Sequence, residues 1–228
     1  MANVAITGAG RGIALELVKL HLAKGDHVHA LLRDPDGAVE LNKLAAESGG
    51  LVTLHAMDVA DDASVKAGAA QTGDGAIDVL YNVAGVSGNT ETELESADFA
   101  DWLEVFNTNV NGPMRVFQAF LPRLGSGAKV VSFGSQVGAS TWPYPGYEVY
   151  AASKAALHRL MLSIALGTKD RGIIAISVHP GWVQTQMGGP QADLTPRESA
   201  EGIAALTSSL TPEMSGGFYK WNGEPHAW

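Results

Sequence analysis

The sequence of 228 residues predicts a three-layer α/β fold, in which one doubly wound, mainly parallel sheet lies between two layers of helices. Short β-branched runs alternate with longer helical segments, and this alternation implies βαβ crossovers. The candidate strand at 173–179 is apolar at successive positions, as in strands that are buried on both faces. Because no linker, repeat or low-complexity segment divides the chain, residues 1–228 are expected to form a single domain.

The elements follow from β-branched runs, helix-length segments and turn residues. In chain order, the candidate strands are residues 4–7, 27–32, 51–57, 77–82, 129–133, 173–179 and 217–221. The candidate helices are residues 13–23, 39–47, 64–71, 98–124 and 150–168. Residues 140–146, with two prolines, and residues 187–196 are expected to be loops. Ligands of a doubly wound sheet bind at the carboxyl ends of its strands, so functional residues are sought directly after each strand.

Composition excludes several kinds of function. The net charge is −9 without any cluster of lysines or arginines, so neither nucleic acid nor an anionic membrane surface is an expected partner. The absence of cysteine excludes disulfides, thiolate metal sites and a cysteine nucleophile. The seven histidines are scattered without metal-ligand spacing, so no metal is expected, and His158 and His179 are expected to pack in the interior. With neither a signal peptide nor a membrane-length apolar run, the expected location is the cytoplasm.

A glycine-rich turn follows the first strand and opens a helix. Residues 7–14 read T-G-A-G-R-G-I-A, and such a turn lets a pyrophosphate approach the helix N-terminus closely. Ile13 stands where the ordinary Rossmann pattern G-x-G-x-x-G has its third glycine. The segment instead resembles the T-G-x-x-x-G-x-G of the short-chain dehydrogenase/reductase family, with Ala14 replacing the last glycine. The cofactor contacts expected here are Gly8, Gly10, Arg11, Gly12 and Ile13.

The end of the second strand bears on which dinucleotide is bound. An acid at this strand end typically holds the ribose hydroxyls of NAD, whereas a nearby arginine favours the 2′-phosphate of NADP. Leu32 occupies the usual acid position, Arg33 follows it, and Arg11 in the glycine loop adds a second guanidinium. These residues favour NADP as the cofactor. In the alternative, both arginines are solvated surface residues and Asp34 is a displaced ribose ligand.

Tyr150 and Lys154 form the strongest chemical motif. Residues four apart share a helix face, so the phenol and the ammonium can lie in one site. A free tyrosine has a pKa of about 10. A neighbouring cation lowers that pKa and prepares the hydroxyl to give or take a proton. Tyr144 and Tyr147 lack a lysine four residues later.

Ser135 follows the strand at 129–133 and resembles the strand-end serine of the family. Ser132 is the nearest competitor, but Gly138, three residues after Ser135, sets the register in favour of Ser135. Ser135 could alternatively satisfy a turn. The gap between Ser135 and Tyr150 is about two residues longer than is typical of the family, and Trp142 lies within it.

The remaining motifs of the family occur in the expected order along the chain. N-V-A-G at 82–85 resembles N-N-A-G, N-V-N-G at 109–112 resembles the N-x-x-G helix motif, and P-G-W-V-Q-T at 180–185 resembles P-G-x-V-x-T. Asn109 is therefore the expected fourth catalytic residue, with Asn107 and Asn111 as alternatives. The further cofactor contacts implied by the resemblance are Asp58, Val59, Asn82, Ala84, Gly85, Pro180, Gly181, Val183 and Thr185.

The resemblance implies hydride transfer between C4 of nicotinamide and a carbonyl or secondary-alcohol carbon. Tyr150 would protonate the carbonyl oxygen and Ser135 would position it. Lys154 would tune Tyr150 and bind the nicotinamide ribose, while Asn109 would hold a proton-relaying water. The short C-terminal end is similar to that of the C-factor and carbonyl-reductase-like branch.

The sequence leaves the substrate pocket, the oligomeric state and a non-enzymatic function open. The substrate pocket is expected at 86–92, 140–147 and 187–193, whose aromatic residues favour a small hydrophobic ketone or aldehyde; they could equally be core or dimer contacts. A homodimer or homotetramer is expected through the helices at 98–124 and 150–168. A non-catalytic NADP(H)-binding sensor is the competing function, and the family's longer epimerase or dehydratase branch is disfavoured by the glycine spacing and the short C-terminus.

Overall fold

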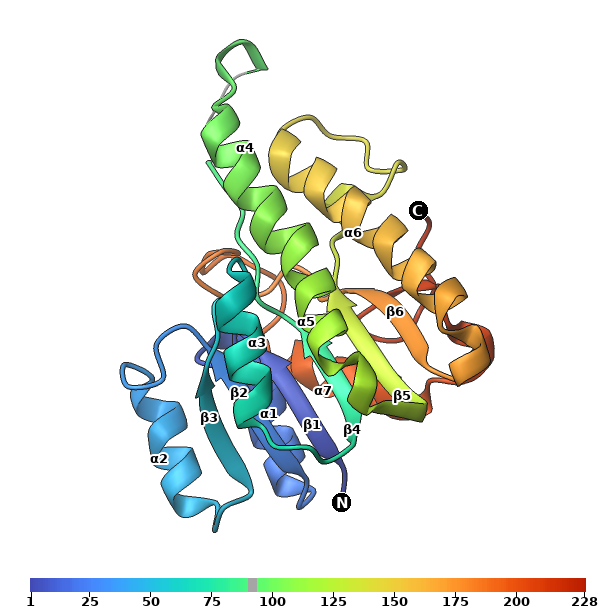
Figure 1. The fold of residues 1–228 in the computed structure, drawn as a ribbon. Helices are drawn as coiled ribbons and strands as arrows, with labels where there is room; N and C mark the ends of the chain where they lie inside the picture. The colour runs from blue at the N-terminus through green and yellow to red at the C-terminus, as the bar shows by residue number, and fades with distance from the viewer. Residues whose placement is uncertain (90–93) are drawn as a thin grey trace.

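The strands form one parallel sheet in the computed structural model, which describes residues 1–89 and 94–228 (Figure 1). Across this part of the chain the strand order is β3-β2-β1-β4-β5-β6-β7, and every neighbouring pair is parallel. The strands are β1 (Asn3–Thr7), β2 (His27–Leu32), β3 (Val52–Ala56), β4 (Ile77–Asn82), β5 (Leu124–Phe133), β6 (Ile174–His179) and β7 (Phe218–Lys220). The predicted fold class is confirmed.

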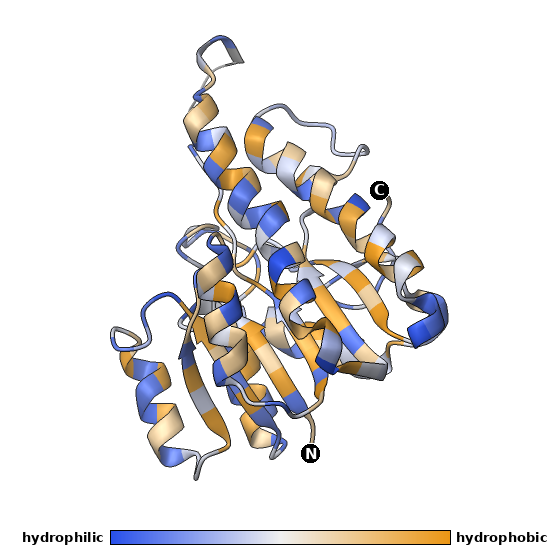
Figure 2. Cartoon of the chain, in the orientation of Figure 1, coloured by the Kyte–Doolittle hydropathy of each residue, from blue (hydrophilic) through white to orange (hydrophobic). Residues whose placement is uncertain are grey.

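Helices cover both faces of the sheet and enclose two apolar cores. Helices α1 (Gly12–Ala23), α2 (Val39–Glu47) and α7 (Pro196–Ser209) pack on one face, while α3 (Asp62–Gln71), α5 (Gly112–Phe120) and α6 (Glu148–Gly167) pack on the other. Apolar residues concentrate on the strands between these layers (Figure 2). Every residue of β6 is buried, as its continuous apolar run predicts.

The helix expected over 98–124 is divided in the structure. Helix α4 (Phe99–Phe106) passes into a five-residue π-helical segment (Asn107–Asn111) and then into α5. A short 3₁₀ turn, Leu121–Arg123, leads into β5, which begins at Leu124 rather than at 129. Leu124 pairs with Ile77, and an irregularity separates that pair from the regular ladder. The apolar pattern of this stretch was compatible with an uninterrupted helix and did not reveal either break.

Helix α7 is an element that the sequence analysis did not name. A capping box begins it, in which the Thr195 side chain accepts the Glu198 N–H and the Glu198 carboxylate accepts the Thr195 N–H. Pro196 occupies the first turn, where its missing N–H costs little. The T-x-x-E spacing at 195–198 is typical of a capping box and predicts the start of a helix.

The order of the strands places the candidate site. Strand β1 lies between β2 and β4, so the chain crosses over in opposite directions from this central strand. In doubly wound sheets the ligand-binding crevice is expected where the connections diverge, at the carboxyl ends of the strands. The segments that follow β1, β4, β5 and β6 therefore meet at one edge of the sheet.

Candidate active site

The glycine loop after β1 packs against the segments that follow β4 and β6. Gly8 has φ +69°, and a Cβ on it would lie 3.1 Å from the Ala84 Cα. Gly12 has φ +58°, and its Cβ would lie 3.3 Å from the Thr185 Cγ2. Side chains at these positions would strain the backbone and fill the crevice. The loop therefore keeps the concave backbone that a pyrophosphate requires.

The start of helix α1 also suits an anion. The Arg11 side chain turns to the Gln186 side chain instead of capping the helix, and the first turn contains no acid. The leading N–H groups of α1 are thus left for another acceptor, which the positive end of the helix dipole favours as an anion. Ala14, at the family's third glycine, is 1% exposed and fits where helix and sheet meet.

The residues after β2 lie at the rim of the crevice. Arg33 and Asp34 are both exposed. The Asp34 carboxylate accepts the Gly37 N–H at 3.0 Å within its own turn. One carboxylate oxygen is therefore engaged locally, whereas the Arg33 guanidinium extends into solvent, where a 2′-phosphate could meet it.

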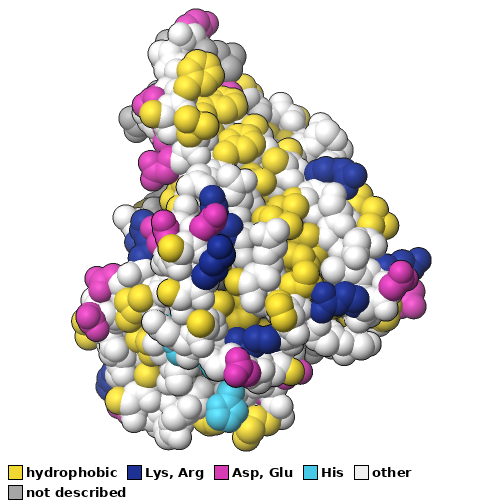
Figure 3. Space-filling model, in the orientation of Figure 1, with side chains coloured by type: hydrophobic (Ala, Val, Ile, Leu, Met, Phe, Trp, Pro, Cys, Tyr) yellow, Lys and Arg dark blue, Asp and Glu magenta, His cyan; other side chains and the backbone are white. Residues whose placement is uncertain are grey.

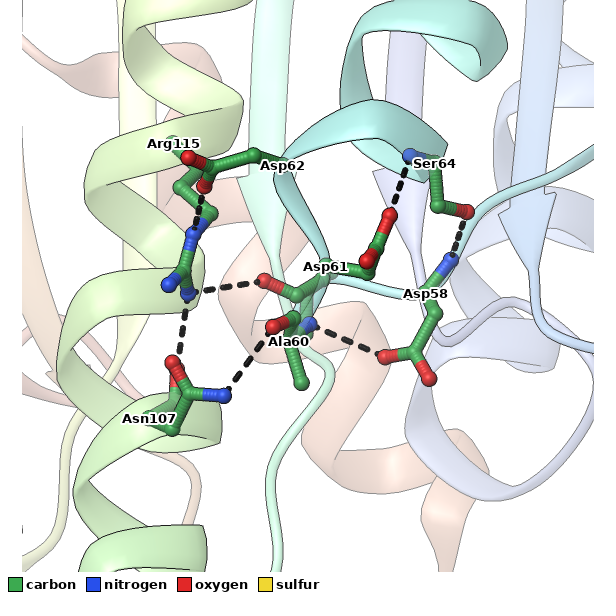
Figure 4. A network of polar contacts seen from close by, with 8 residues as sticks. Asp58, Ala60, Asp61, Asp62, Ser64, Asn107 and Arg115 are labelled. Carbon is green, nitrogen blue, oxygen red and sulfur yellow. Dashed lines mark hydrogen bonds and ion pairs between the residues drawn. The ribbon is translucent and has the colours of Figure 1, made fainter.

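The turn after β3 is held in place by a polar network that reaches α5 (Figure 4). The Ala60 N–H donates to the Asp58 carboxylate at 2.9 Å, and the Asp58 N–H donates to the Ser64 hydroxyl at 2.8 Å. The Arg115 guanidinium on α5 pairs with the Asp62 carboxylate at the start of α3. Asn107 donates to the Ala60 carbonyl at 3.0 Å, so this amide serves the turn rather than the catalytic group. The network fixes the Asp58-Val59 segment at the carboxyl end of β3.

Ser135, Tyr150 and Lys154 come together from β5 and α6. The Ser135 hydroxyl accepts the Val137 N–H at 3.2 Å, the turn role given above as the alternative, and it also faces the Tyr150 side chain, whose pKa it lowers. The Lys154 Nζ donates to the Phe133 carbonyl at 2.7 Å and lies 5.4 Å from the centre of the Tyr150 ring. A Cβ on Gly138 would lie 2.7 Å from the Ala155 nitrogen, so this glycine permits the close approach of the Ser135 turn to α6.

The pKa of Tyr150 differs from the sequence-based prediction. Burial raises it to about 12, opposed only in part by the hydrogen bond from Ser135. Burial also lowers the pKa of Lys154 to about 8. The expected lowering of the Tyr150 pKa is wrong for the protein alone, because desolvation dominates and the ammonium is engaged by the Phe133 carbonyl beneath the ring.

Asn109 lies in the π-helical segment and is completely buried. Its side chain pairs with the backbone of Val86, accepting the N–H at 2.9 Å and donating to the carbonyl at 2.8 Å. Its amide also donates to the Ser153 hydroxyl at 3.0 Å. A Cβ on Gly85 would lie 3.1 Å from the Asn109 Oδ1 and 3.5 Å from the Lys154 Nζ, so Gly85 keeps the space between these side chains open.

Two alternatives to the predicted residues lie elsewhere. Ser132 is buried in the sheet, where its hydroxyl accepts the Asn82 side-chain amide at 3.1 Å. Asn111 is exposed.

Ser153 and Thr7 are positions that the sequence analysis missed. Ser153 links Asn109 to the Tyr150 carbonyl, to which it donates at 2.8 Å, and the Thr7 hydroxyl accepts the N–H groups of Val83 and Ala84.

The segment after β6 closes the crevice beside the glycine loop. The Pro180 carbonyl accepts the Ser199 hydroxyl at 2.6 Å, and Gly181 has φ +87°. Val183 is buried, and the Thr185 N–H donates to its carbonyl at 2.7 Å. This tight turn places Thr185 against Gly12 of the glycine loop.

The predicted pocket segments are only partly described. Residues 90–92 of the segment 86–92 lie outside the described residues. The rings of Trp142 and Tyr144 meet edge-on at 5.1 Å, and Tyr144, Trp182 and Met187 are largely exposed. Among the residues that the structure describes, the Trp142 Nε1 is one of the buried polar atoms without a hydrogen-bond partner.

Among residues 1–89 and 94–228, no cluster of three or more His, Asp or Glu side chains suited to a metal ion is found. In the same part of the chain, no helix combines the length and apolarity that crossing a membrane requires.

Comparison with known proteins identifies the family. Residues 2–194 match the family profile described as short chain dehydrogenase. The chain is 39% identical to the C-signal of Myxococcus xanthus over 68% of this chain and 94% of that protein. It is 33% identical to the short chain dehydrogenase gsfK of Penicillium aethiopicum over 100% of this chain and 99% of that protein.

Solved structures agree with this assignment. The NADPH-bound carbonyl reductase from chicken fatty liver superimposes with a TM-score of 0.92 at 34% identity, covering 100% of this chain and 99% of that one. The carbonyl reductase Sniffer of D. melanogaster superimposes with a TM-score of 0.93 at 28% identity, covering 100% of both chains. The chain is therefore a single-domain oxidoreductase that belongs to the short-chain dehydrogenase/reductase family.

Proposed function

We propose that the protein reduces a small hydrophobic ketone or aldehyde with NADPH, using Tyr150 as the proton donor. The observation that carries the proposal is the meeting of Ser135, Tyr150 and Lys154 after β5, at the edge of the sheet that also carries the glycine loop after β1. The cofactor would supply the hydride from C4 of its nicotinamide. The protein would supply the proton and the placement of the carbonyl.

Each polar group has a distinct role in this proposal. The Ser135 hydroxyl donates to the carbonyl oxygen and holds it beside Tyr150. With its pKa raised to about 12, Tyr150 stays protonated at neutral pH and can protonate the developing alkoxide. Lys154 is buried and would bind the nicotinamide ribose from its position below the ring. Asn109, through its place between Val86 and Ser153, keeps the π-helical segment in position and would hold a proton-relaying water near Lys154.

The cofactor preference rests on Arg33 and Arg11. The 2′-phosphate of NADPH would lie near the exposed Arg33 guanidinium, and Leu32 stands where an NAD-binding acid would otherwise repel it. The NADPH named for the chicken carbonyl reductase supports this preference. The other contacts would be the glycine-loop backbone, the Asp58-Val59 turn, Asn82 through Gly85, and the segment from Pro180 to Thr185.

Aromatic and apolar residues in the segments after β5 and β6 support a hydrophobic substrate. Trp142 and Tyr144 lie in the loop between Ser135 and Tyr150, and Trp182 and Met187 lie beyond β6. We propose that they line the substrate pocket. Replacing Trp142 with Ala is expected to abolish activity without unfolding the protein, and full activity on every substrate would refute this role.

Exposed apolar side chains on α4 favour self-association. Phe99 is 73% exposed and Leu103 is 74% exposed, and α4 projects from the body of the molecule with apolar side chains on its surface (Figure 3). Patches of this kind commonly mark protein interfaces. We propose a homodimer or homotetramer that buries α4 together with α5 and α6; sedimentation of wild type and of Leu103→Glu distinguishes this assembly from a monomer.

The function is tested by following NADPH and NADH oxidation by the purified protein across a panel of aldehydes and ketones. Turnover that is faster with NADPH, and that loses this preference in Arg33→Asp, is expected. Tight NADPH binding without turnover in either direction would refute the reductase and favour an NADP(H)-binding sensor.

A further inference from the structure

A buried histidine contacts the backbone that carries Ser135. His158 lies four residues after Lys154 and eight after Tyr150, so the three side chains share one face of α6. The His158 Nε2 accepts the Ser135 N–H at 3.2 Å. His158 is 1% exposed, so this contact is shielded from water. The expectation that His158 only packs in the interior is therefore incomplete.

The position of the imidazole is fixed by its neighbours. Its ring packs against Phe218 of β7 with 4.0 Å between centroids and 35° between the ring planes, and Trp228 meets it edge-on at 6.0 Å. A Cβ on Gly134 would lie 2.3 Å from the His158 Nε2. Only a glycine at 134 lets the end of β5 approach the ring this closely.

The residues that hold the ring belong to a C-terminal hairpin, defined here as residues 218–228. Tyr219 and Pro225 form an antiparallel bridge, and the His226 N–H donates to the Phe218 carbonyl at 2.8 Å. The Trp228 carbonyl accepts the Ser140 hydroxyl at 2.6 Å. The hairpin therefore covers the outer side of His158 and reaches Ser140, the first residue of the loop predicted at 140–146.

The chemistry of the contact requires a neutral imidazole. A ring nitrogen accepts a hydrogen bond only when it carries no proton, so the single proton of His158 must be on Nδ1. The charged or titratable groups that act on it are Lys154 on its own helix, His179 on β6 and His226 in the hairpin. All of them disfavour the imidazolium, and together with burial, the largest cause, they lower the pKa of His158 to about 3. The acceptor is thus present throughout the neutral range.

We propose that His158 is a positioning residue, which sets the place of the Ser135 hydroxyl by accepting the Ser135 N–H. The proposal rests on the proposed function, in which Ser135 holds the carbonyl oxygen. The backbone N–H of residue 135 and the hydroxyl of the same residue move together. Losing the acceptor would let the turn shift and would misplace the hydroxyl relative to Tyr150.

The test compares His158→Leu, which removes the acceptor, with His158→Gln, whose side-chain oxygen can replace it. For the carbonyl substrate, kcat/KM is expected to fall on the order of tenfold to a hundredfold in His158→Leu and much less in His158→Gln. The Kd for NADPH is expected to stay within about twofold of wild type, because the contact lies away from the glycine loop. His21→Leu is the matched control: it also removes a buried, hydrogen-bonded histidine, but from α1. This control is expected to lower stability and leave kcat/KM unchanged.

A Ser135→Ala background separates positioning from general destabilisation. If His158 acts through the Ser135 hydroxyl, His158→Leu should cause little further loss once that hydroxyl is absent. An equal loss in both backgrounds would overturn the proposal.

Hydrogen exchange of the Ser135 amide provides a readout that does not depend on turnover. Exchange should be slow in wild type, at least tenfold faster in His158→Leu, and intermediate or slow in His158→Gln. Fast exchange of the Ser135 amide in wild type would overturn the proposal. An exchange rate in His158→Leu equal to that of wild type would also overturn it. Neither outcome depends on kinetic data for His158→Leu. A wild-type protein without any turnover would refute the proposed function, and the exchange rates would still decide the role of His158.

Discussion

Gly8 offers the sharpest test of the glycine loop, because the chain contains a matched control for it. Gly8 and Gly25 have nearly equal backbone angles, φ +69° and φ +76°. A Cβ on Gly25 would meet nothing within 4 Å, whereas a Cβ on Gly8 would lie 3.1 and 3.2 Å from the Ala84 Cα and nitrogen. Gly25→Ala therefore measures the cost of a left-handed alanine, and Gly8→Ala measures that cost plus the contact.

The magnitudes follow from these two contributions. A left-handed conformation costs an alanine about 1–2 kcal/mol. The reduced freedom of the unfolded chain offsets about 0.4–1 kcal/mol of this cost, so Gly25→Ala should lower the free energy of unfolding by about 1 kcal/mol. The Ala84 backbone cannot move aside as a flexible side chain could, so Gly8→Ala should lose a further ~1–3 kcal/mol through overpacking.

Urea denaturation gives both free energies, and titration with NADPH gives the functional effect. Gly8→Ala should weaken NADPH binding, because the loop must move away from Ala84, while Gly25→Ala should bind normally. Equal destabilisation of the two variants, or normal NADPH binding by Gly8→Ala, would refute the packing of the loop against the end of β4.

Three further predictions concern the catalytic residues. Because burial lowers the pKa of Lys154 to about 8, its ammonium is present below that pH and is lost as the pH rises through it. We therefore expect kcat/KM for NADPH to decline above pH 8. A pH profile of kcat/KM that stays flat to pH 9.5 would contradict a need for the cation. Asn109→Leu should lower the free energy of unfolding by about 2–4 kcal/mol, because it leaves the Val86 N–H and carbonyl unpaired. Asn107→Ala, which removes one hydrogen bond to the Ala60 carbonyl, should lower it by about 1 kcal/mol. Equal free energies of unfolding for the two variants in urea would contradict this prediction. Gly138→Ala should lower the free energy of unfolding by about 1–3 kcal/mol and remove most activity, because the added Cβ pushes α6 away from Ser135. A Cβ on Gly167 would meet nothing within 4 Å, so Gly167→Ala should be neutral or stabilising. Thermal denaturation and kinetics of the two variants test this difference.

The fold could be predicted from the sequence because its signals are local. Strands β2 and β4 have the predicted bounds, and the others differ by a few residues, most at the start of β5. The break at Asn107–Asn111 could not be predicted, because it depends on a tertiary pairing of the Asn109 side chain with Val86. Helix α7 could have been predicted, because the T-x-x-E spacing of its capping box is a local signal.

The site was predictable where spacing constrains geometry. Tyr150 and Lys154 lie four apart on one helix, and Gly138 set the register for Ser135 through a contact that the structure makes explicit. The pKa of Tyr150 could not be read in this way, because it depends on how deeply the ring is buried and on where the Lys154 ammonium donates. For the same reason His158 was interpreted as a packing residue: its bond to Ser135 joins residues 23 apart and has no sequence pattern.

Tyr150 is proposed to protonate the carbonyl oxygen during NADPH-dependent reduction. The most direct measurement is single-turnover NADPH oxidation at saturating carbonyl substrate, with NADPH binding measured on the same samples of wild type, Tyr150→Phe and Tyr219→Phe. Tyr150→Phe should bind NADPH as wild type does and lose about 10²–10⁴-fold in rate, as expected for general acid catalysis, while Tyr219→Phe should remain active. A Tyr150→Phe protein that oxidises NADPH within a few-fold of the wild-type rate would contradict the claim.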